Sequence, residues 1–358
     1  MNKSEIINIF NSIPLADTHE HLLEEKDRLK NPAYKGYNDI GLLFRQYVES
    51  DLIVSGMSER QADLIKDETI PADSKWKIIR QFWPLIRHTG YGMMVRETIR
   101  VLYDENDISD SNWKKINDKI AAQVKPGFYD HILKDICNID HCQVNALDAP
   151  LYRKSERADF LMDLCVSRLC SDFDVILVQD ILQRPPEKLD DCIEAIDRSF
   201  LDFGPKSIAV KNQSAYRRKI DYNVRELNDV KQCFNHCREK DWQVNRTERK
   251  ALEDFLVYHT IKKATESGLP YKMHTGYHSG HGTMPLHNLR HNAGDMSNLC
   301  RLHPESSFVF MHINYPHQDE LIALAKHYPN AYVDMCWSWM ISPLAAVRFL
   351  KEFLTAVP

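Results

Sequence analysis

In the stretch Ile13-Pro14-Leu15-Ala16-Asp17-Thr18-His19-Glu20-His21, a short apolar run leads directly into two histidines. If this run is a β-strand, His19 and His21 point to one face and Glu20 to the other, because side chains alternate along a strand. Two imidazoles on one face can form half of a metal site. The alternative is a pair of surface histidines at the end of a strand, and the rest of the sequence must decide between the two.

The composition is that of a globular protein with a large core. The chain has 358 residues, 43% of them hydrophobic and 10% aromatic, and could form one large domain or two ordinary ones. A net charge of -5 without a basic stripe argues against nucleic acid as a partner. The sequence shows no membrane span and no apolar signal-peptide core, and its nine scattered cysteines suit reduced thiols, so we expect a cytoplasmic protein.

Short β-branched runs alternate with helical stretches along the chain, which is the order of parallel βα units. Because no glycine-rich dinucleotide turn is found, this order favours a closed (β/α) barrel, with a doubly wound sheet as the alternative. The predicted strands are 15–18, 143–146, 174–179, 207–211, 271–274, 307–312 and 331–334. The predicted helices include 155–169, 188–200, 247–266, 318–326 and 343–354.

A long segment separates the first two predicted strands. Residues 24–140 have helical periodicity and include Trp76, Trp83 and Trp113, which predicts a helical lid inserted into a single barrel domain of residues 1–358. A βα connection leaves a barrel strand at its carboxyl end, where the active sites of barrels lie. We therefore expect the lid to lie beside the site.

Polar side chains stand at the ends of several predicted strands, and these ends meet on one face of a barrel. They are His19, His21, Lys211, His274 and His312. A buried imidazole is costly unless the protein uses it. Neutral imidazoles suit Zn²⁺, and a site with three protein ligands and a water is of the catalytic type. Such a metal lowers the pKa of its water and polarises a substrate carbonyl.

The order of these motifs resembles the amidohydrolase superfamily, and within it the amidohydrolase-2 group that includes the N-terminal region of FluG-like proteins. The likeness covers most of the chain outside the insertion, and the order of the motifs is more specific than any one of them. The motifs are Asp17-Thr18-His19-Glu20-His21, Lys211 with Tyr216-Arg217-Arg218, His274-Thr275-Gly276-Tyr277, His312 with Tyr315-Pro316, and Tyr328-Pro329-Asn330-Ala331-Tyr332-Val333-Asp334.

This resemblance implies an α/β fold, a distorted (β/α)8 TIM-type barrel. It also implies one divalent metal, usually zinc, with manganese or iron as alternatives. Carried onto this sequence, the metal ligands are His19, His21 and His274. His312 matches the histidine that contacts the metal-bound water or the substrate, and is the first candidate catalytic residue.

The sequence departs from the superfamily at its last strand. Members carry an aspartate after an eighth strand, which holds the metal and acts as general base, but we find only seven strands. Either the molecule is shortened, or a strand is miscounted and Asp334, after the seventh strand, is the base. Shortening is the favoured interpretation. It would leave an open edge between the seventh and first strands, through which a homo-oligomer could form.

Lys211 has two interpretations, a carboxylated lysine that bridges two metals or an ammonium that binds an anionic group of the substrate. The second is favoured and fits the nearby Arg217, since arginine suits carboxylates. Tyr277 and Trp337 complete the residues expected to contact substrate. The histidines of loop 276–291 are interpreted as part of a polar active-site loop, with a second metal site as the alternative.

Three functions follow as hypotheses. The preferred one is a metal-dependent hydrolase in which metal-activated water attacks a C–N bond, amide or related, of a small carboxylate-bearing substrate. On the same barrel, uronate-isomerase-like or decarboxylase chemistry is the alternative. The third is a truncated, non-catalytic remnant of the fold. The fold alone does not choose among them.

Overall fold

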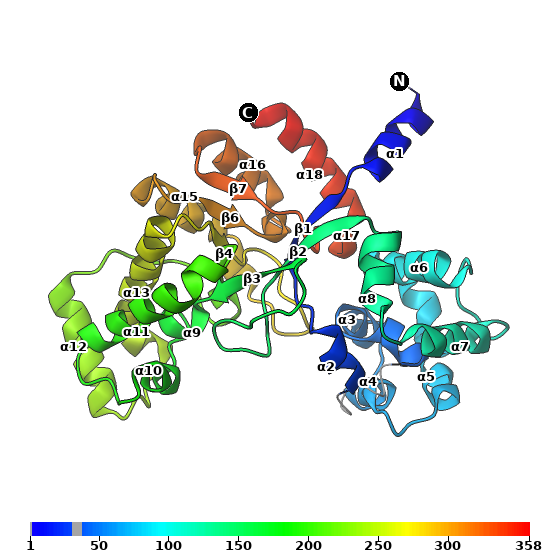
Figure 1. Ribbon diagram of the computed structural model, residues 1–358, viewed down its shortest axis with the longest axis horizontal. Coiled ribbons are helices and arrows are strands. Elements are labelled where there is room, and N and C mark those ends of the chain that lie inside the picture. Colours follow the sequence, from blue (N-terminus) through cyan, green and yellow to red (C-terminus); the bar gives the residue numbers. More distant parts are fainter. Residues whose placement is uncertain (1, 31–37) are drawn as a thin grey trace.

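The computed structural model describes residues 2–30 and 38–358. Its centre is one sheet of seven parallel strands, paired in chain order from β1 to β7 (Figure 1). The strands are β1 Leu15–Glu20, β2 Ile139–Val144, β3 Phe160–Cys165, β4 Ala209–Asn212, β5 Tyr271–Met273, β6 Phe308–Phe310 and β7 Ala331–Val333. Helices carry the chain back between most successive strands, as parallel pairing requires, whereas residues 145–159 between β2 and β3 contain no helix.

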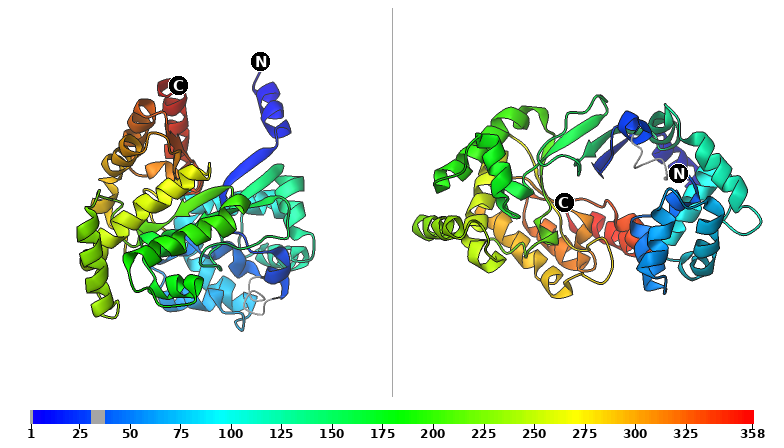
Figure 2. Two further views of the ribbon diagram at one scale, coloured as in Figure 1. Left: turned by 60° about the vertical axis from the view of Figure 1, so that its left-hand side comes forward. Right: turned by 90° about the horizontal axis from the view of Figure 1, so that it is seen from below.

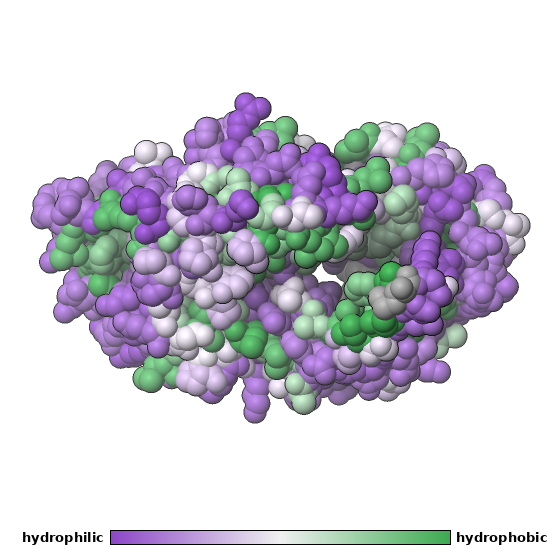
Figure 3. Space-filling model, turned by 90° about the horizontal axis from the view of Figure 1, so that it is seen from above, coloured by the Kyte–Doolittle hydropathy of each residue, from purple (hydrophilic) through white to green (hydrophobic). Residues whose placement is uncertain are grey.

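The sheet curls but does not close on itself (Figure 2). Each strand pairs with the next, and within residues 2–30 and 38–358 no eighth strand lies between β7 and β1. The predicted distorted (β/α) barrel with seven recognisable strands is thus confirmed. The space-filling view from above shows a hollow with hydrophobic residues along part of its edge (Figure 3).

The third strand was wrongly placed from the sequence. Residues 174–179, predicted as a strand, lie in helix α10 (Val175–Leu182), and the predicted helix 155–169 contains β3 instead. Asp174 begins α10 by accepting hydrogen bonds from the backbone of Ile176 and Leu177, a capping signal that outweighs the β-branched composition. β3 lies within a covered parallel sheet and therefore lacks the alternation that identifies a half-exposed strand.

Helices occupy the described part of the segment between β1 and β2, and residues 31–37 of the predicted lid lie outside the described residues (Figure 1). The helices of residues 40–123 have their own hydrophobic core, in which Trp76, Trp83 and Trp113 are buried and which Trp337 joins from beyond β7. Tyr129 and Leu133 pack instead in a cluster with residues of β2 and β3. The elements are α2 Glu25–Lys30, η2 Ile40–Phe44, α3 Tyr47–Val54, α4 Glu59–Lys66, α5 Ala72–Ile86, α6 Gly90–Tyr103, α7 Trp113–Gln123, α8 Phe128–Asp130 and η3 His131–Ile136.

The remaining helices pack on the sheet or flank its ends, and the predicted helices 188–200, 247–266, 318–326 and 343–354 are confirmed as α11, α13, α16 and α18. They are α1 Lys3–Ser12, α9 Ser167–Cys170, α10, α11 Leu189–Phe203, η4 Gly204–Lys206, η5 Ser214–Tyr216, α12 Leu227–Glu239, α13 Arg246–Glu266, α14 Leu286–Leu289, α15 Asn292–Leu302, η6 His312–Asn314, α16 Gln318–His327, α17 Ser338–Ile341 and α18 Pro343–Ala356. None of the described helices is both long and apolar enough to cross a membrane.

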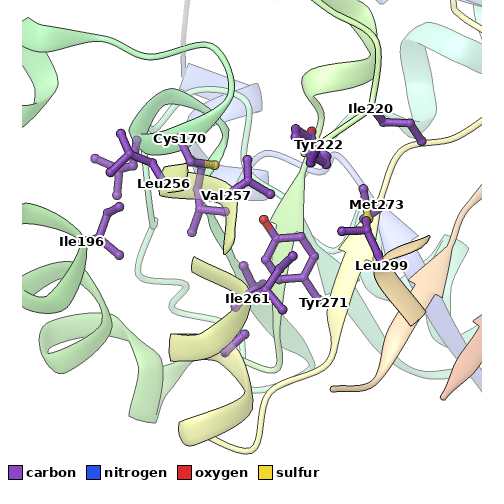
Figure 4. Close-up of a cluster of buried hydrophobic side chains, with 14 of the residues drawn as sticks. Cys170, Ile196, Ile220, Tyr222, Leu256, Val257, Ile261, Tyr271, Met273 and Leu299 are labelled. Carbon is purple, nitrogen blue, oxygen red and sulfur yellow. The ribbon is translucent and has the colours of Figure 1, made fainter. Parts of the chain in front are cut away.

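The main core forms where α13 packs on the sheet (Figure 4). Val257 and Ile261 of α13 are fully buried beside Tyr271 of β5. The Tyr271 hydroxyl is 2.9 Å from the Thr260 hydroxyl and accepts a hydrogen bond from Asn212 at 3.1 Å, so its polar atom is satisfied inside the core. This packing fixes β4 and β5, whose carboxyl ends carry two of the predicted site residues.

Candidate metal centre

β1 brings His19 and His21 together as predicted. Their ring centroids lie 4.6 Å apart, and both line a cavity of about 280 Å³ at the carboxyl ends of the strands. Glu20 was expected on the opposite face, but it lines the same cavity. The pairing of β1 with β2 slips by one residue between Asp17 and Glu20, and this bulge disturbs the strict alternation of side chains.

His274 and His312 follow β5 and β6 and stand side by side. Their ring centroids are 4.5 Å apart, and His312 Nε2 lies 3.1 Å from His274 Nδ1. The backbone of residues 312–314 is left-handed, with φ of 62°, 48° and 54° at three consecutive non-glycine positions. Such strain costs energy and persists only where the surroundings enforce it, which is typical of functional sites.

Gly276 allows the two histidine loops to approach each other. A Cβ atom on Gly276 would lie 2.5 Å from the carbonyl carbon of Asn314, and the residue has a φ of +67°. Only glycine accepts both conditions without a shift of the backbone. The close contact therefore holds the loop that carries His274 against the loop that carries His312.

Lys211, at the end of β4, is completely buried beside the first-strand histidines. Its Nζ lies 3.4 Å from His19 Nδ1 and 2.5 Å from Met311 Sδ. Burial lowers the pKa of Lys211 to about 8. The neutral amine is therefore accessible near physiological pH, which is the state that carboxylation needs, and both interpretations of this lysine stay open.

The sequence analysis missed Cys336. This residue lies beyond β7, two positions after Asp334, and its Sγ is 3.2 Å from His312 Nδ1. The donor atoms of His19, His312 and Cys336 all lie within 4.8 Å of one another. In the part of the chain that the structure describes, this is the trio with metal-site spacing, rather than the expected trio of His19, His21 and His274. A thiol just past a strand end was the available signal.

All four histidines are neutral at pH 7. Burial lowers the pKa of His21 to about 4 and that of His312 to about 3. Burial is the main cause that holds the pKa of His19 and of His274 well below the usual range, and the positive charge of Lys211 lowers the pKa of both rings further. Neutral imidazoles are the form that binds metal ions. The donor set of imidazole nitrogens and a thiol thus fits a divalent metal.

Asp334 contacts protein groups with both of its oxygens. Its Oδ1 accepts a hydrogen bond from the Cys336 amide at 2.6 Å, and its Oδ2 accepts one from the Thr18 hydroxyl. Burial raises the pKa of Asp334, but the hydrogen bonds from Cys336 and Thr18 outweigh burial and leave the pKa below its usual value. The carboxylate is ionised, is 4% exposed and does not line the 280 Å³ cavity.

The cavity continues outward under aromatic side chains. Tyr47 of the inserted helices packs on Trp337 at 4.7 Å between ring centroids, and both line the 280 Å³ cavity. A second cavity of about 800 Å³ shares Glu20, Tyr47 and Tyr216 with it. The insertion thus contributes to the wall of the site. The 280 Å³ cavity is lined by Asp17, His19, Glu20, His21, Tyr47, Gln213, Tyr216, His274, His312, Cys336, Trp337, Trp339 and Met340.

Two other predicted substrate contacts, Tyr277 and Arg217, do not line the 280 Å³ cavity. Tyr277 accepts a hydrogen bond from His274 Nε2 through its carbonyl oxygen at 2.9 Å, and its ring packs on Trp337. Arg217 lines a neighbouring cavity of about 450 Å³ and forms an ion pair with Asp172 at 3.5 Å. In contrast, Arg218 is buried and is held by two carboxylates of α13, so it belongs to the structure of the barrel wall.

The histidines of loop 276–291 are spread out. His278 packs on Tyr216 at 4.8 Å between ring centroids, whereas His281 faces Glu59 of the insertion at 3.4 Å. His287 and His291 are exposed. Within the described ranges these four residues do not form a second group with metal-ligand spacing, so the polar-loop interpretation is the one that agrees with the geometry.

The parallel strands, with imidazoles and a thiol near their carboxyl ends, agree with the expected amidohydrolase-type barrel. The amidohydrolase family model matches residues 236–358, which include His274, His312 and Cys336. The protein fluG of Emericella nidulans is 29% identical over 164 residues, a match that covers 43% of this chain and 18% of fluG. The resemblance to the amidohydrolase superfamily and its amidohydrolase-2 group is therefore confirmed.

Solved structures show the same fold. A uronate isomerase from Thermotoga maritima superposes with a TM-score of 0.72 at 16% identity, covering 99% of this chain and 82% of that chain. A metal-dependent hydrolase described as putative, from Lactobacillus casei, gives 0.61 at 15% identity, covering 98% of this chain and 81% of that one. A uronate isomerase from Bacillus halodurans gives 0.59 at 16% identity, covering 99% and 81%. At this identity the likeness concerns the fold.

Proposed function

We propose that this protein is a metal-dependent hydrolase that cleaves a C–N bond, amide or related, of a small carboxylate-bearing substrate. The observation that carries the proposal is the gathering of four neutral imidazoles from β1, β5 and β6 around one cavity. The proposed metal-binding imidazoles are His19, His21 and His274, with His312 beside them. Zinc is the preferred ion, because imidazoles suit it, and manganese and iron are the alternatives.

When bound, a divalent metal supplies Lewis acidity and activates water at neutral pH. The side chains around it have separate tasks. His312 is the catalytic residue placed to stabilise negative charge that develops on the substrate oxygen. Asp17 and Glu20 are the carboxyl groups that line the cavity, and they are placed to pass a proton to the leaving nitrogen. Asp334, the base in the alternative in which a strand is miscounted, acts instead by positioning the loop that follows β7.

The substrate reaches from the metal centre towards the positive side of the cavity. Lys211 lies beneath the histidines, and Arg217 lies in the adjoining 450 Å³ cavity, which shares Gln213 and Tyr216 with the site. A guanidinium is suited to a carboxylate, so Arg217 is the proposed anchor for the acid group. The rings of Trp337 and Tyr277 lie on the lid side and exclude water from the reacting end.

A uronate-isomerase-like reaction is the second candidate, and one observation favours it. The two uronate isomerases cover 99% of this chain, including the inserted helices, with TM-scores of 0.72 and 0.59. Decarboxylation is possible on the same site. The test is a substrate panel of amides, lactones and uronates, with turnover of uronates alone assigning the second candidate. No turnover with any of them, despite bound metal, would favour the non-catalytic remnant.

Association is proposed for the open side of the barrel. Helix α1 has no buried residue and exposes Phe10, and the exposed Leu15 of β1 and Leu344 of α18 add apolar surface near the unpaired strands. Exposed apolar surface and unpaired strand edges favour pairing with another chain. Sedimentation of the purified protein tests this, and a monomer at all concentrations would contradict it.

The metal itself is tested by elemental analysis of the purified chain after dialysis. We expect about one divalent ion per chain in the native protein and a large loss in His274→Ala. The matched control is His291→Ala, because His291 is exposed on the same stretch of chain and outside the cavity. A His274→Ala variant with full metal content would contradict the ligand assignment, and a native chain without metal would contradict the proposed function.

A further inference from the structure

We propose that Cys336 is a metal ligand, and that its sulfur binds the ion together with His19 and His312. The inference rests on the proposed function, because it needs the divalent metal. It goes beyond that function by adding a thiolate to the imidazole site. It also revises the ligand set proposed above, because His274 then orients His312 and does not itself bind the ion.

The spacing of the donor atoms carries the first step. Those of Cys336, His19 and His312 lie within 4.8 Å of one another, and Cys336 Sγ lies 3.2 Å from His312 Nδ1. In a tetrahedral site with Zn–N bonds of about 2.0–2.1 Å and Zn–S bonds of about 2.3 Å, donor atoms lie roughly 3.3–3.8 Å apart. The trio therefore needs only small side-chain movements to close on an ion.

The hydrogen bonds of the neighbouring rings determine which nitrogen of His312 is free. A carbonyl oxygen only accepts, so His274 Nε2 carries a proton and donates to the Tyr277 carbonyl at 2.9 Å. His274 Nδ1 must then accept from His312 Nε2 at 3.1 Å. In these neutral rings His312 Nδ1 keeps its lone pair. Although the Cys336 carbonyl also lies 3.2 Å from this nitrogen, it cannot donate, whereas the thiol can.

The hydrogen bonds from His312 to His274 and from His274 to Tyr277 correspond to the outer partners that orient the ligands of metal sites. A ligating imidazole normally donates its other N–H to a partner that fixes the ring orientation. For His312 that partner is His274, which is in turn held by the Tyr277 carbonyl. When the ion binds, the Cys336 S–H bond breaks, the S–metal bond forms and the proton leaves to solvent.

The backbone places the sulfur at the site. The Cys336 amide donates to Asp334 at 2.6 Å, and the next residue, Trp337, has a left-handed φ of 60°. Trp337 is at the same time packed against His312 at 5.1 Å between ring centroids. A strained residue held by packing on both sides is typical of a functional turn. The turn after β7 therefore presents Cys336 to the histidines.

A thiolate ligand narrows the choice of metal. Sulfur is a soft donor that selects zinc and cobalt over manganese and magnesium, which prefer oxygen. The proposal thus predicts that the full chain binds Zn²⁺ and Co²⁺ far more tightly than Mn²⁺. A site made of imidazoles alone would show a smaller difference in affinity between Zn²⁺ or Co²⁺ and Mn²⁺.

The test is the absorption spectrum of the full chain loaded with Co²⁺ alone. We expect a sulfur-to-cobalt charge-transfer band in the near ultraviolet, which histidine ligands cannot produce. In Cys336→Ser the band is expected to disappear, and Zn²⁺ affinity to fall on the order of 100-fold, since loss of even an outer partner costs about 10–100-fold. Cys165→Ser is the matched control, because Cys165 also ends a strand, β3, but lies outside the trio.

The outcomes separate this inference from the proposed function. Stoichiometric Co²⁺ without the band in the native chain, or unchanged Zn²⁺ affinity in a folded Cys336→Ser variant, would overturn the thiolate ligand and leave the metal-dependent function standing. No binding of Co²⁺ or Zn²⁺ to the native chain would overturn both. If the Cys336→Ser variant does not fold, the presence or absence of the sulfur-to-cobalt band in the native chain still tests whether a thiolate binds the ion.

Discussion

Thr18 donates its hydroxyl to the carboxylate of Asp334, and this hydrogen bond connects β1 to the end of β7 across the open side of the barrel. The other carboxylate oxygen accepts from the Cys336 amide. One side chain thus links the strand that carries His19 to the turn that carries Cys336. β1 and β7 do not pair with each other, and this link holds their ends together without an intervening strand.

Asp334→Asn is expected to lower the free energy of unfolding by about 1–3 kcal/mol, because a buried charge-assisted hydrogen-bond pair becomes poorly satisfied. Urea unfolding monitored by circular dichroism measures this change. Thr18→Val should give a smaller loss in the same direction. Asp319→Asn, which removes an exposed carboxylate paired with Arg348, is the control and should change little. Equal stability of Asp334→Asn and the native chain would show that the link is not needed.

Gly276→Ala is expected to destabilise the protein by more than about 3 kcal/mol and to reduce its metal content. The new Cβ would collide with the backbone of Asn314 and separate the loops of His274 and His312, in addition to the strain of a left-handed alanine. Thermal unfolding and elemental analysis measure the two effects.

Gly280→Ala is the matched control for this change. Gly280 has a φ of +97°, but no atom lies within 4 Å of the position that a Cβ would take, so the variant reports the backbone strain alone. We expect a loss of about 1–2 kcal/mol and unchanged metal content. If both variants lose the same stability and metal, close packing of the two loops is not what holds the histidines.

The strand ends were predictable from the sequence because their signals are local. A short apolar run followed by a polar residue marks the end of a parallel strand, and this identified His19, His21, Lys211, His274 and His312. β3 was not predictable in the same way. Its residues are covered on both sides and carry no alternation, whereas α10 is rich in β-branched residues but is capped by Asp174.

Two features of the site depend on contacts that periodicity cannot reveal. Glu20 faces the cavity because β1 slips against β2, and a bulge of this kind is set by pairing with a partner strand far along the chain. Cys336 reaches His312 because residues 312–314 and Trp337 adopt left-handed conformations that these residue types disfavour. A thiol just past a strand end marks Cys336 as a candidate, but its contact with His312, like the position of Glu20, depends on tertiary packing.

Asp295 is expected to make stability depend on pH. Burial is the main cause that raises the pKa of Asp295 from 3.8 to about 6, and the negative charge of the Asp221 carboxylate is the second. Between these values the folded state binds more protons than the unfolded chain, so the free energy of unfolding falls as pH rises from about 4 to 6. Asp295→Asn should therefore be more stable than the native chain at pH 7, by about 1–2 kcal/mol, with no gain at pH 3.

The measurement for Asp295 is a series of urea titrations between pH 3 and pH 8 on both proteins. The difference between the two unfolding free energies should grow from about pH 4 to pH 6 and then stay constant. Asp202→Asn changes an exposed position on α11 and is the control. Its free energy of unfolding should depend on pH in the same way as that of the native chain. A constant offset between Asp295→Asn and the native chain over the whole range would exclude the raised pKa.

Lys272 of β5 supports the site from inside the barrel. Its Nζ donates to both oxygens of Asp163 on β3, at 2.9 and 3.1 Å, and to the Thr18 carbonyl at 3.0 Å, directly before His19. Both charged residues are almost fully buried. Lys272→Met is expected to cost about 3–5 kcal/mol, because Asp163 is left as a buried charge without its partner. It should also weaken metal binding by releasing the backbone that positions His19.

The double variant Lys272→Met with Asp163→Leu separates these two effects. Removing both charges abolishes the cost of the unpaired carboxylate, so its unfolding free energy should recover most of the loss, since buried ion pairs add little net stability over apolar groups. The Thr18 carbonyl, however, still lacks its donor in the double variant. We therefore expect stability to return while zinc affinity stays reduced, which denaturant titration and competitive zinc binding would measure. Recovery of both quantities together would mean that Lys272 does not position His19.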